Sequence, residues 1–339
     1  MRSRQAFVLK LLTGLVALLA LLFVAAPSSR ILVLFLVGRS EICSLRQGLE
    51  VPGQFRRQRQ LQEQLARSAR LLKEDGTLQL WSVGRSEFWV PKRSKENLPL
   101  FLAEQERGIY GAGPYGVKSG DIVLDCGAHI GMFVRTALGR GAKLVVAIEP
   151  SPENIECLRR NFAAEVATGR VIVYPKGVWD ADTELDLSVD HRSSARDSVV
   201  WSPDERQARV RIPVTTIDRI VAELGLGRVD FIKMDIEGAE RWALRGARGT
   251  LVRYWPRLAI AVEHMLDDVS VFPALVTGVA PGYGMTWGPC QERGLRIVPE
   301  VGFFVHAEPP LSGLTTRKPS AGLTPKQVGI RIIRVSKPR

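Results

Sequence analysis

The sequence predicts an α/β protein in which helices cover both faces of a mostly parallel sheet. The first observation is a set of five apolar runs of strand length between residues 121 and 264. The second is that segments with helical periodicity lie between the first three of these runs. Strands that alternate with helices favour parallel pairing, and such sheets bind their ligands at the carboxyl ends of the strands.

The five predicted strands are DIVLDCG (121–127), KLVVAIEP (143–150), RVIVYPKG (170–177), RVDFIKMD (228–235) and RLAIAVEH (257–264). A helix is predicted after Ile130, and a second over 153–162, where Ile155, Leu158 and Phe162 share one face. Residues 178–216 are polar with short alternating pieces, which predicts an insertion or an antiparallel ribbon.

The first predicted element is a transmembrane or membrane-associated helix. Residues 6–26 form a nearly continuous apolar stretch, long enough as a helix to cross the ~30 Å hydrocarbon core of a membrane. Pro27 disfavours the alternative of a cleaved signal peptide. A second apolar run over 31–37 leaves open a re-entrant hairpin with both ends in the cytoplasm.

Four regions are predicted: a membrane anchor over 1–40, a linker over 41–118, an α/β domain over 119–308 and a basic flexible tail over 309–339. Within the linker, residues 54–75 predict a helix. Residues 77–83 and 87–90 then alternate like the two strands of a hairpin.

The four cysteines are Cys43, Cys126, Cys157 and Cys290. They are far apart and form no CxxC pair or cluster with histidine. We therefore expect neither a zinc site nor a disulfide framework, and the cysteine usage fits a reducing compartment.

A glycine-rich turn, DCGAHIG (125–131), lies where the first predicted strand meets the first helix. Gly127 and Gly131 would let a ligand approach the backbone, and the start of the helix offers unpaired N–H groups. A dinucleotide fingerprint requires glycine two residues after Gly127, where this chain has His129. The turn therefore favours a nucleoside without a pyrophosphate over NAD.

Glu149 ends the second predicted strand, where a carboxylate can accept both hydroxyls of a ribose. Together with Asp125, Gly127 and Gly131 it predicts an adenosyl site. Trp179 either stacks on the adenine or fills the core. The remaining predicted contacts to this ligand are Ala128, His129, Pro150 and Asp180.

Several segments resemble, in order, the signature of the FkbM family of methyltransferases. They are DIVLDCGAHIGMF, VVAIEPSPENIECLRRNF, VTTIDRI, RVDFIKMDIEGAERWALRGA and the strand that ends in VEH. The resemblance covers about 115–306, and KMDIEGAE (233–240) is its most specific part. It implies a Rossmann-like, seven-stranded, mostly parallel class I methyltransferase sheet with S-adenosyl-L-methionine as cofactor. His129 stands where many members have Asn, which leaves this expectation intact.

Under this resemblance, the enzyme has to align an acceptor oxygen with the methyl group of a sulfonium and provide a base. Asp235 is the predicted base or acceptor-orienting group, and Glu237 and His264 are its predicted helpers. Glu237 could instead only stabilise the start of a helix. Asp235, Glu263 and His264 are a ligand set that suits a divalent cation, but we expect a reaction without a metal.

We therefore expect an S-adenosyl-L-methionine-dependent O-methyltransferase acting on a hydroxyl of a glycan, a glycolipid or a related small metabolite. The cofactor is made inside the cell, so the anchored catalytic domain is expected to face the cytoplasm. Nucleic acid is not an expected partner, because the basic excess of the chain lies in its flanks. Two alternatives remain: an NAD-dependent oxidoreductase, and a non-catalytic nucleoside-binding module tethered to a membrane. The sequence does not determine the oligomeric state.

Overall fold

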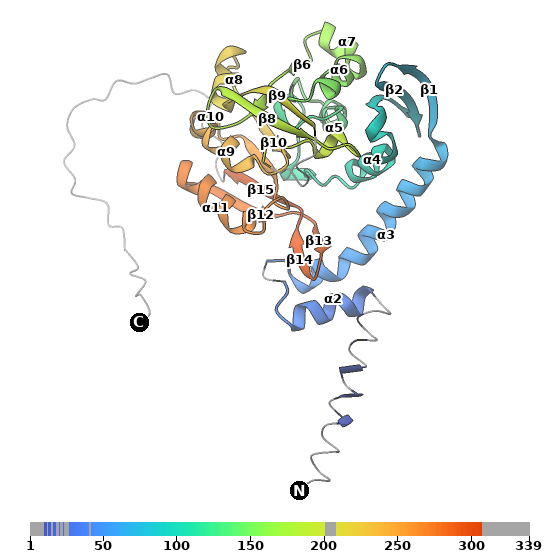
Figure 1. Ribbon diagram of the computed structural model, residues 1–339. Coiled ribbons are helices and arrows are strands. Elements are labelled where there is room, and N and C mark those ends of the chain that lie inside the picture. Colours follow the sequence, from blue (N-terminus) through green and yellow to red (C-terminus); the bar gives the residue numbers. More distant parts are fainter. Residues whose placement is uncertain are drawn as a thin grey trace, which may run out of the picture. The chain divides into compact units, whose positions relative to one another are not determined.

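A seven-stranded sheet forms the centre of the protein (Figure 1). The computed structural model describes residues 27–40, 42–200 and 208–306, with scattered positions between 10 and 23. The strand order is β12-β15-β11-β10-β4-β5-β6. The strands are β4 (Ile122–Cys126), β5 (Leu144–Ile148), β6 (Val171–Tyr174), β10 (Phe231–Met234), β11 (Arg257–Ala261), β12 (Tyr283–Trp287) and β15 (Val301–His306).

The five strands expected from the apolar runs are all present. They pair with one another only in the parallel sense. β15 adds to β11 in the antiparallel sense, and β12 adds antiparallel to β15. The prediction of a mostly parallel α/β sheet with seven strands is therefore confirmed. Each observed strand is shorter than its predicted run, and Glu149 and Asp235 lie just beyond the carboxyl ends of β5 and β10.

Successive residues of the central strands point to opposite faces of the sheet and build two separate cores. Leu124 of β4 and Ile232 of β10 lie in one core, and Val123 and Phe231 lie in the other. The first core is covered by α8 (Ile217–Glu223), α9 (Glu240–Arg245), α10 (Arg248–Tyr254) and α11 (Asp268–Val279). The second is covered by α5 (Met132–Gly139) and α6 (Pro152–Asn161), with the short α7 (Ala163–Ala167) following.

The polar stretch after β6 is an insertion with its own small sheet. It contains β7 (Gly177–Val178), β8 (Thr183–Val189) and β9 (Ala208–Thr215) in the order β7-β9-β8, with the 3₁₀ turn η3 (Ser194–Arg196) between β8 and β9. β8 and β9 pair antiparallel, as the alternation of the sequence predicts. A further hairpin, β13 (Cys290–Arg293) and β14 (Arg296–Pro299), lies between β12 and β15.

Residues before the central sheet pack against it instead of forming a free linker. They form α2 (Pro27–Leu36), α3 (Leu45–Ser68), β1 (Arg70–Asp75), β2 (Leu78–Val83), β3 (Ser86–Pro91), η1 (Lys92–Asn97), α4 (Leu98–Glu106) and η2 (Gly113–Tyr115). The predicted hairpin is confirmed as β2 and β3. The helix predicted over 54–75 is wrong at its C-terminal end, because residues 70–75 pair with β2 as an exposed edge strand.

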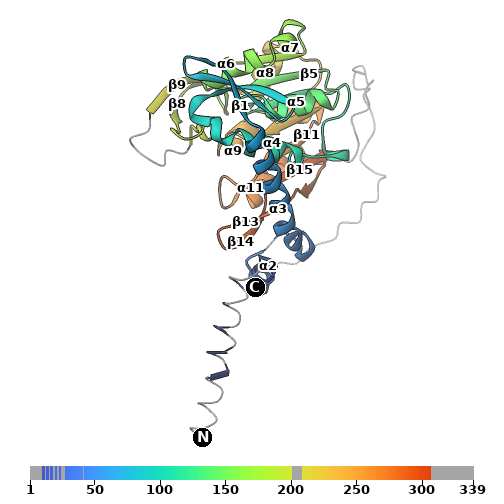
Figure 2. The same cartoon turned by 90° about the vertical axis from the view of Figure 1, so that its right-hand side faces the viewer.

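The long helix α3 contacts α2, α4, β2 and the β13 hairpin, and it runs along the catalytic domain in both views (Figures 1 and 2). It begins with a capping box: the Ser44 hydroxyl accepts the N–H of Gln47, and the Gln47 side chain accepts the N–H of Ser44. This cap fixes where the chain turns from α2 into α3.

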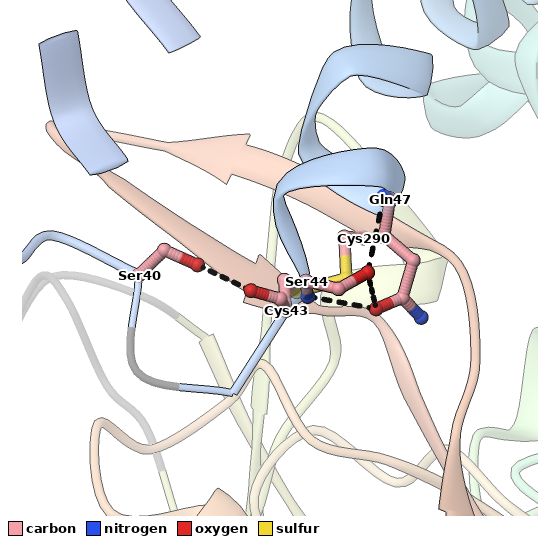
Figure 3. Close-up of a disulfide and its surroundings, with 5 residues drawn as sticks. All are labelled: Ser40, Cys43, Ser44, Gln47 and Cys290. Carbon is pink, nitrogen blue, oxygen red and sulfur yellow. Dashed lines mark hydrogen bonds between the residues drawn. A yellow bond between two sulfur atoms is a disulfide. The ribbon is translucent and has the colours of Figure 1, made fainter. Parts of the chain in front are cut away.

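A disulfide joins Cys43, at the turn between α2 and α3, to Cys290 at the start of β13 (Figure 3). The two residues are separated by 247 positions in the sequence. The expectation that the cysteines form no disulfide is therefore wrong for this pair. The pairing depends on α2 and α3 packing against the β13 hairpin, which no local sequence pattern shows. Cys126 and Cys157 are buried free thiols.

Most of the predicted membrane anchor over 6–26, and the tail from Pro309 onward, lie outside the described residues. Among the residues that are described, no helix is both long and apolar enough to span a membrane.

Candidate active site at the carboxyl ends of the strands

A cavity of about 950 Å³ opens at the carboxyl ends of β4, β5, β10 and β11. Gly127, Glu149, Asp235 and His264 follow these four strands in that order, and all of them line the cavity. Parallel strands end at the same edge of a sheet, so residues distant in sequence meet there. The other walls come from α3, α4, η1 and the insertion around η3.

The turn after β4 can be made only with glycine at Gly127. Its φ is +77°, and a Cβ atom there would lie 2.0 Å from the backbone oxygen of Asp235. Gly131 has a φ of +95°, and a Cβ there would lie 2.1 Å from the ring of Phe162. The backbone of residues 127–129 lines the cavity, whereas Gly131 acts behind it at the start of α5. The turn thus brings bare backbone up to a ligand.

Glu149 lies at the end of β5 and is held in one orientation by three donors. Its Oε1 atom accepts the N–H of Ser151 at 2.9 Å and the Asn154 amide at 3.3 Å. Its Oε2 atom accepts the N–H of His129 at 2.8 Å. Burial raises the pKa of Glu149 to about 7 although these donors favour the charged form. Oε1 already accepts two hydrogen bonds and Oε2 accepts one, so Oε2 keeps a lone pair for a further donor.

His129 closes one side of this region. Its φ is +51°, and histidine is one of the residue types enriched in this left-handed conformation. Its Nε2 atom lies 2.8 Å from the Ser194 hydroxyl of η3, and the Ser94 hydroxyl bonds to Ser194 in turn. Burial, assisted by the positive charges of Lys233 and Arg93, lowers the pKa of His129 to about 3. The imidazole is therefore neutral at physiological pH.

Arg93 of η1 fastens the insertion over the cavity. It pairs with Asp197 at 2.6 Å and with Glu153 of α6 at 3.0 Å, and it also donates to the carbonyl of Asp190. The segment before the sheet and the insertion after β6 are thereby tied together above the strand ends. No local pattern in the sequence pointed to Arg93.

Asp235 follows β10 and lies between a phenol and an ammonium group. Tyr110 donates its hydroxyl to the Asp235 Oδ2 atom at 2.5 Å. Lys233 lies 3.9 Å from the same oxygen and 3.2 Å from Asp125, which is fully buried. Burial opposes ionisation of Asp235, but Lys233, His264 and the Tyr110 hydrogen bond outweigh it and hold its pKa below the usual value. Asp235 is therefore a carboxylate near neutral pH.

Glu237 and His264 lie beside Asp235, as the sequence predicted for a catalytic group. The His264 Nε2 atom is 3.6 Å from the Asp235 Oδ1 atom and 3.7 Å from the Glu237 Oε1 atom. The Nδ1 atom of His264 is 3.0 Å from Glu240, which is fully buried. Glu237 adopts a left-handed backbone conformation with a φ of +53°. The turn after β10 therefore aims its carboxylate at the strand ends.

Further acidic groups surround this cluster. Burial raises the pKa of Glu104 to about 7, and the negative charges of Asp235, Glu263 and Glu300 add to the shift. Glu300 pairs with Arg107. Sequence reasoning missed Glu104 and Tyr110 as site residues. Both belong to the EQERGIYG segment (104–111), and the structure brings that segment to the cavity.

The remaining predicted cofactor contacts fall into two groups. Ala128 and Pro150 line the cavity. Trp179 stacks on Trp242 with a centroid separation of 4.6 Å, and neither Trp179 nor Asp180 is part of the cavity lining. Asp125 lies beneath the site and pairs with Lys233. Trp179 is partly buried and packs on Trp242 and on a small apolar cluster of the insertion, so its contact with adenine stays a prediction.

Comparison with known proteins finds similarity to one family of methyltransferases. Residues 125–273 match the model of the methyltransferase FkbM domain. The chain is 26% identical over 197 residues to the 31-O-demethyl-FK506 methyltransferase FkbM of Streptomyces tacrolimicus, a match that covers 50% of this chain and 74% of that protein.

Two solved structures match the chain at low sequence identity. Methyltransferase FkbM from Methylobacillus flagellatus is 19% identical with a TM-score of 0.42, and the match spans 74% of this chain but only 59% of that one. TYW2 of M. jannaschii, solved in complex with AdoMet, is 15% identical with a TM-score of 0.38, and the match spans 70% of this chain and 90% of that one. The match of residues 125–273 to the methyltransferase FkbM domain agrees with the resemblance that the sequence motifs indicate.

Proposed function

We propose that the protein transfers the methyl group of S-adenosyl-L-methionine to a hydroxyl of a glycan, a glycolipid or a related metabolite. The observation that carries the proposal is the shared cavity of Glu149 and Asp235. One carboxylate is suited to a ribose and the other to an acceptor proton. A single cavity of about 950 Å³ is large enough for both molecules.

The residues of the first half of the cavity fit this cofactor. Gly127, Ala128 and His129 line this half, and the Oε2 atom of the buried Glu149 carboxylate keeps a lone pair for a ribose hydroxyl. When bound, S-adenosyl-L-methionine supplies a methyl group on a positively charged sulfur. The neutral His129 adds no positive charge that would oppose a sulfonium.

Asp235 would orient the acceptor hydroxyl and take up its proton. As the acceptor oxygen bonds to the methyl carbon, the carbon–sulfur bond breaks and the O–H proton becomes strongly acidic. A carboxylate with a lowered pKa is a sufficient acceptor for such a proton. Tyr110 and Lys233 hold Asp235 ionised and in place for this role.

Basic side chains also line the cavity, but the acidic groups around Asp235 support a neutral, hydroxyl-rich acceptor. Five carboxyl groups line the cavity near the proposed acceptor position: Glu104, Asp235, Glu237, Glu263 and Glu300. Carboxylates accept hydrogen bonds from sugar hydroxyls and repel anionic acceptors. This composition favours a glycan or glycolipid hydroxyl over a phosphorylated acceptor.

Calorimetry with S-adenosyl-L-methionine, followed by transfer of a labelled methyl group to a panel of glycans and lipids, tests the proposal. Asp235→Asn should lower transfer by about 100-fold or more while changing cofactor affinity little, because a general base contributes 10²–10⁴-fold. Asp267→Asn, at an exposed acid that pairs with Arg241, is the control and should retain activity. Exclusive methylation of nitrogen or carbon acceptors would overturn the hydroxyl assignment.

We also propose that the catalytic domain faces the cytoplasm, because its cofactor is made there. Attachment through residues 6–26 stays a prediction. The Cys43–Cys290 disulfide bears on this proposal, since such bonds persist in oxidising compartments and are reduced in the cytoplasm. The redox state of this pair in the cell therefore tests the proposed compartment.

A further inference from the structure

Three potential metal ligands from two strand ends face one another in the cavity. They are a carboxylate oxygen of Asp235, a carboxylate oxygen of Glu237 and an imidazole nitrogen of His264, all within 4.8 Å of one another. The His264 Nε2 atom is 3.6 Å and 3.7 Å from the two oxygens, which is longer than a hydrogen bond. The three atoms therefore surround a gap instead of closing it.

The imidazole of His264 has one nitrogen near a buried carboxylate and the other near Asp235 and Glu237, as is common for histidine ligands of metal ions. His264 is nine-tenths buried, with a side-chain exposure of 10%. Its Nδ1 atom lies 3.0 Å from the Oε1 atom of Glu240, which also accepts the N–H of Ile236 at 2.8 Å. A buried carboxylate 3.0 Å from one ring nitrogen favours an orientation in which the other nitrogen can exchange its proton for a metal ion. That other nitrogen, Nε2, points at Asp235 and Glu237.

The surroundings of the cluster carry an excess of negative charge. Glu104 interacts electrostatically with Asp235, and it also interacts with Glu263 and Glu300. The nearest ammonium group, Lys233, is 3.2 Å from Asp125 and 3.9 Å from Asp235, so it is shared between two carboxylates. A divalent cation in place of the His264 proton would add positive charge among these acids and reduce their mutual repulsion.

We propose that Asp235, Glu237 and His264 bind one divalent cation of the Mg²⁺ or Mn²⁺ class. Two carboxylates and one imidazole form a mainly oxygen ligand set, which suits these cations. The sequence had grouped Glu263 with Asp235 and His264, but Glu263 accepts a hydrogen bond from Gln291 at 2.5 Å and lies outside the cluster. Glu237 takes its place.

We expect the cation to bind the acceptor hydroxyl, and this role rests on the proposed function. Three protein ligands leave coordination positions open toward the cavity. Those positions would hold the acceptor hydroxyl and lower its pKa, as a bound cation does for water. An acceptor with two adjacent hydroxyls, as in most sugars, would fill two of them.

The proposal can be tested without an enzymatic assay by titrating the full-length protein with Mn²⁺. The electron paramagnetic resonance signal of free Mn²⁺ decreases as the ion binds, so its loss measures binding. One Mn²⁺ per chain is expected. Glu237→Gln and His264→Gln should each weaken binding by about tenfold or more. Glu263→Gln is the matched control, since it removes a neighbouring charge of the same cavity, and its affinity should stay within about twofold.

Failure of wild-type protein to bind Mn²⁺ while circular dichroism shows it folded would overturn the cation site. Unchanged affinity in both Glu237→Gln and His264→Gln would overturn it as well. Cofactor binding in EDTA separates the two proposals. If methyl transfer continues in EDTA and the protein binds no Mn²⁺, only the cation site is overturned. Stoichiometric Mn²⁺ binding with no methylation of any hydroxyl acceptor removes only the proposed function.

Discussion

The pKa values of single carboxyl groups in the cavity depend on the balance between burial and a few neighbouring groups. Glu149 and Asp235 are both carboxyl groups at strand ends, but their pKa values move in opposite directions. Burial dominates at Glu149 and raises its pKa to about 7. At Asp235 the neighbouring Lys233, His264 and Tyr110 outweigh burial and lower its pKa. The two groups can therefore serve different ends of one transfer reaction.

Cofactor affinity should rise with pH through about 7. We expect the ionised Glu149 to accept a ribose hydroxyl at its Oε2 atom, and in the free protein it takes up a proton as the pH falls below its raised pKa. Affinity measured by calorimetry should be roughly tenfold weaker at pH 6 than at pH 8. The folded state also binds this proton more tightly than the unfolded state, so the stability contribution of Glu149 falls as pH rises from 4.5 to about 7.

Glu149→Gln is the control for this pH dependence. The amide cannot ionise, so binding should be weak and nearly constant between pH 6 and 8. A slope that survives in the variant would assign the titration to another group.

At the scale of elements, the turn between β4 and α5 is the part of the fold that admits least variation. Gly127 touches the backbone of Asp235 at the end of β10, so the turn also sets the spacing of two neighbouring strand ends. The cofactor half and the acceptor half of the cavity therefore share one backbone contact. A change at Gly127 acts on both.

Gly127→Ala should destabilise the protein by at least about 2 kcal/mol and abolish cofactor binding, because the added Cβ meets a backbone oxygen in a left-handed conformation. Gly139→Ala provides the comparison. Gly139 lies in α5, and a Cβ atom added there would have nothing within 4 Å, so the stability of this variant should rise or stay within about 1 kcal/mol. Thermal melts with and without cofactor measure both. Equal behaviour of the two variants would show that the turn is not constrained.

At the scale of the whole molecule, the segment before the sheet belongs to the catalytic unit. α3 and η1 line the cavity, and the Cys43–Cys290 disulfide fastens the start of α3 to the β13 hairpin. A cross-link that closes so long a loop restricts the unfolded chain strongly. The disulfide thus holds a wall of the site that lies far from the core strands in sequence.

Reductant should lower the stability of purified, oxidised protein by about 2–4 kcal/mol, measured as a fall in melting temperature. The Cys43→Ser, Cys290→Ser double variant should melt at the lower temperature whether or not reductant is present. Alkylation of intact cells before lysis then reports the compartment. Four reactive cysteines in the denatured protein agree with a cytoplasmic domain. Two, at Cys126 and Cys157, would overturn that proposal.

Local pattern in the sequence determined the five parallel strands and the glycine turn. Each of these features depends on neighbouring residues: apolar runs bury a strand on both faces, and a left-handed turn requires glycine. Glu149 was predictable for the same reason, since it ends a strand whose position in the sheet follows from the alternation of elements. The helix end at Ser68 was not, because β-pairing with β2 overrides the local helical pattern.

Only the tertiary structure decided which side chains meet across the strand ends. His264 and Glu263 are adjacent in sequence, but His264 faces Asp235 while Glu263 reaches Gln291. Successive residues point in different directions, so composition alone grouped the wrong carboxylate. Tyr110 on Asp235 and Cys43 on Cys290 likewise join segments more than a hundred positions apart. Such contacts depend on how whole helices and strands pack, and the spacing of residues along the sequence does not predict that packing.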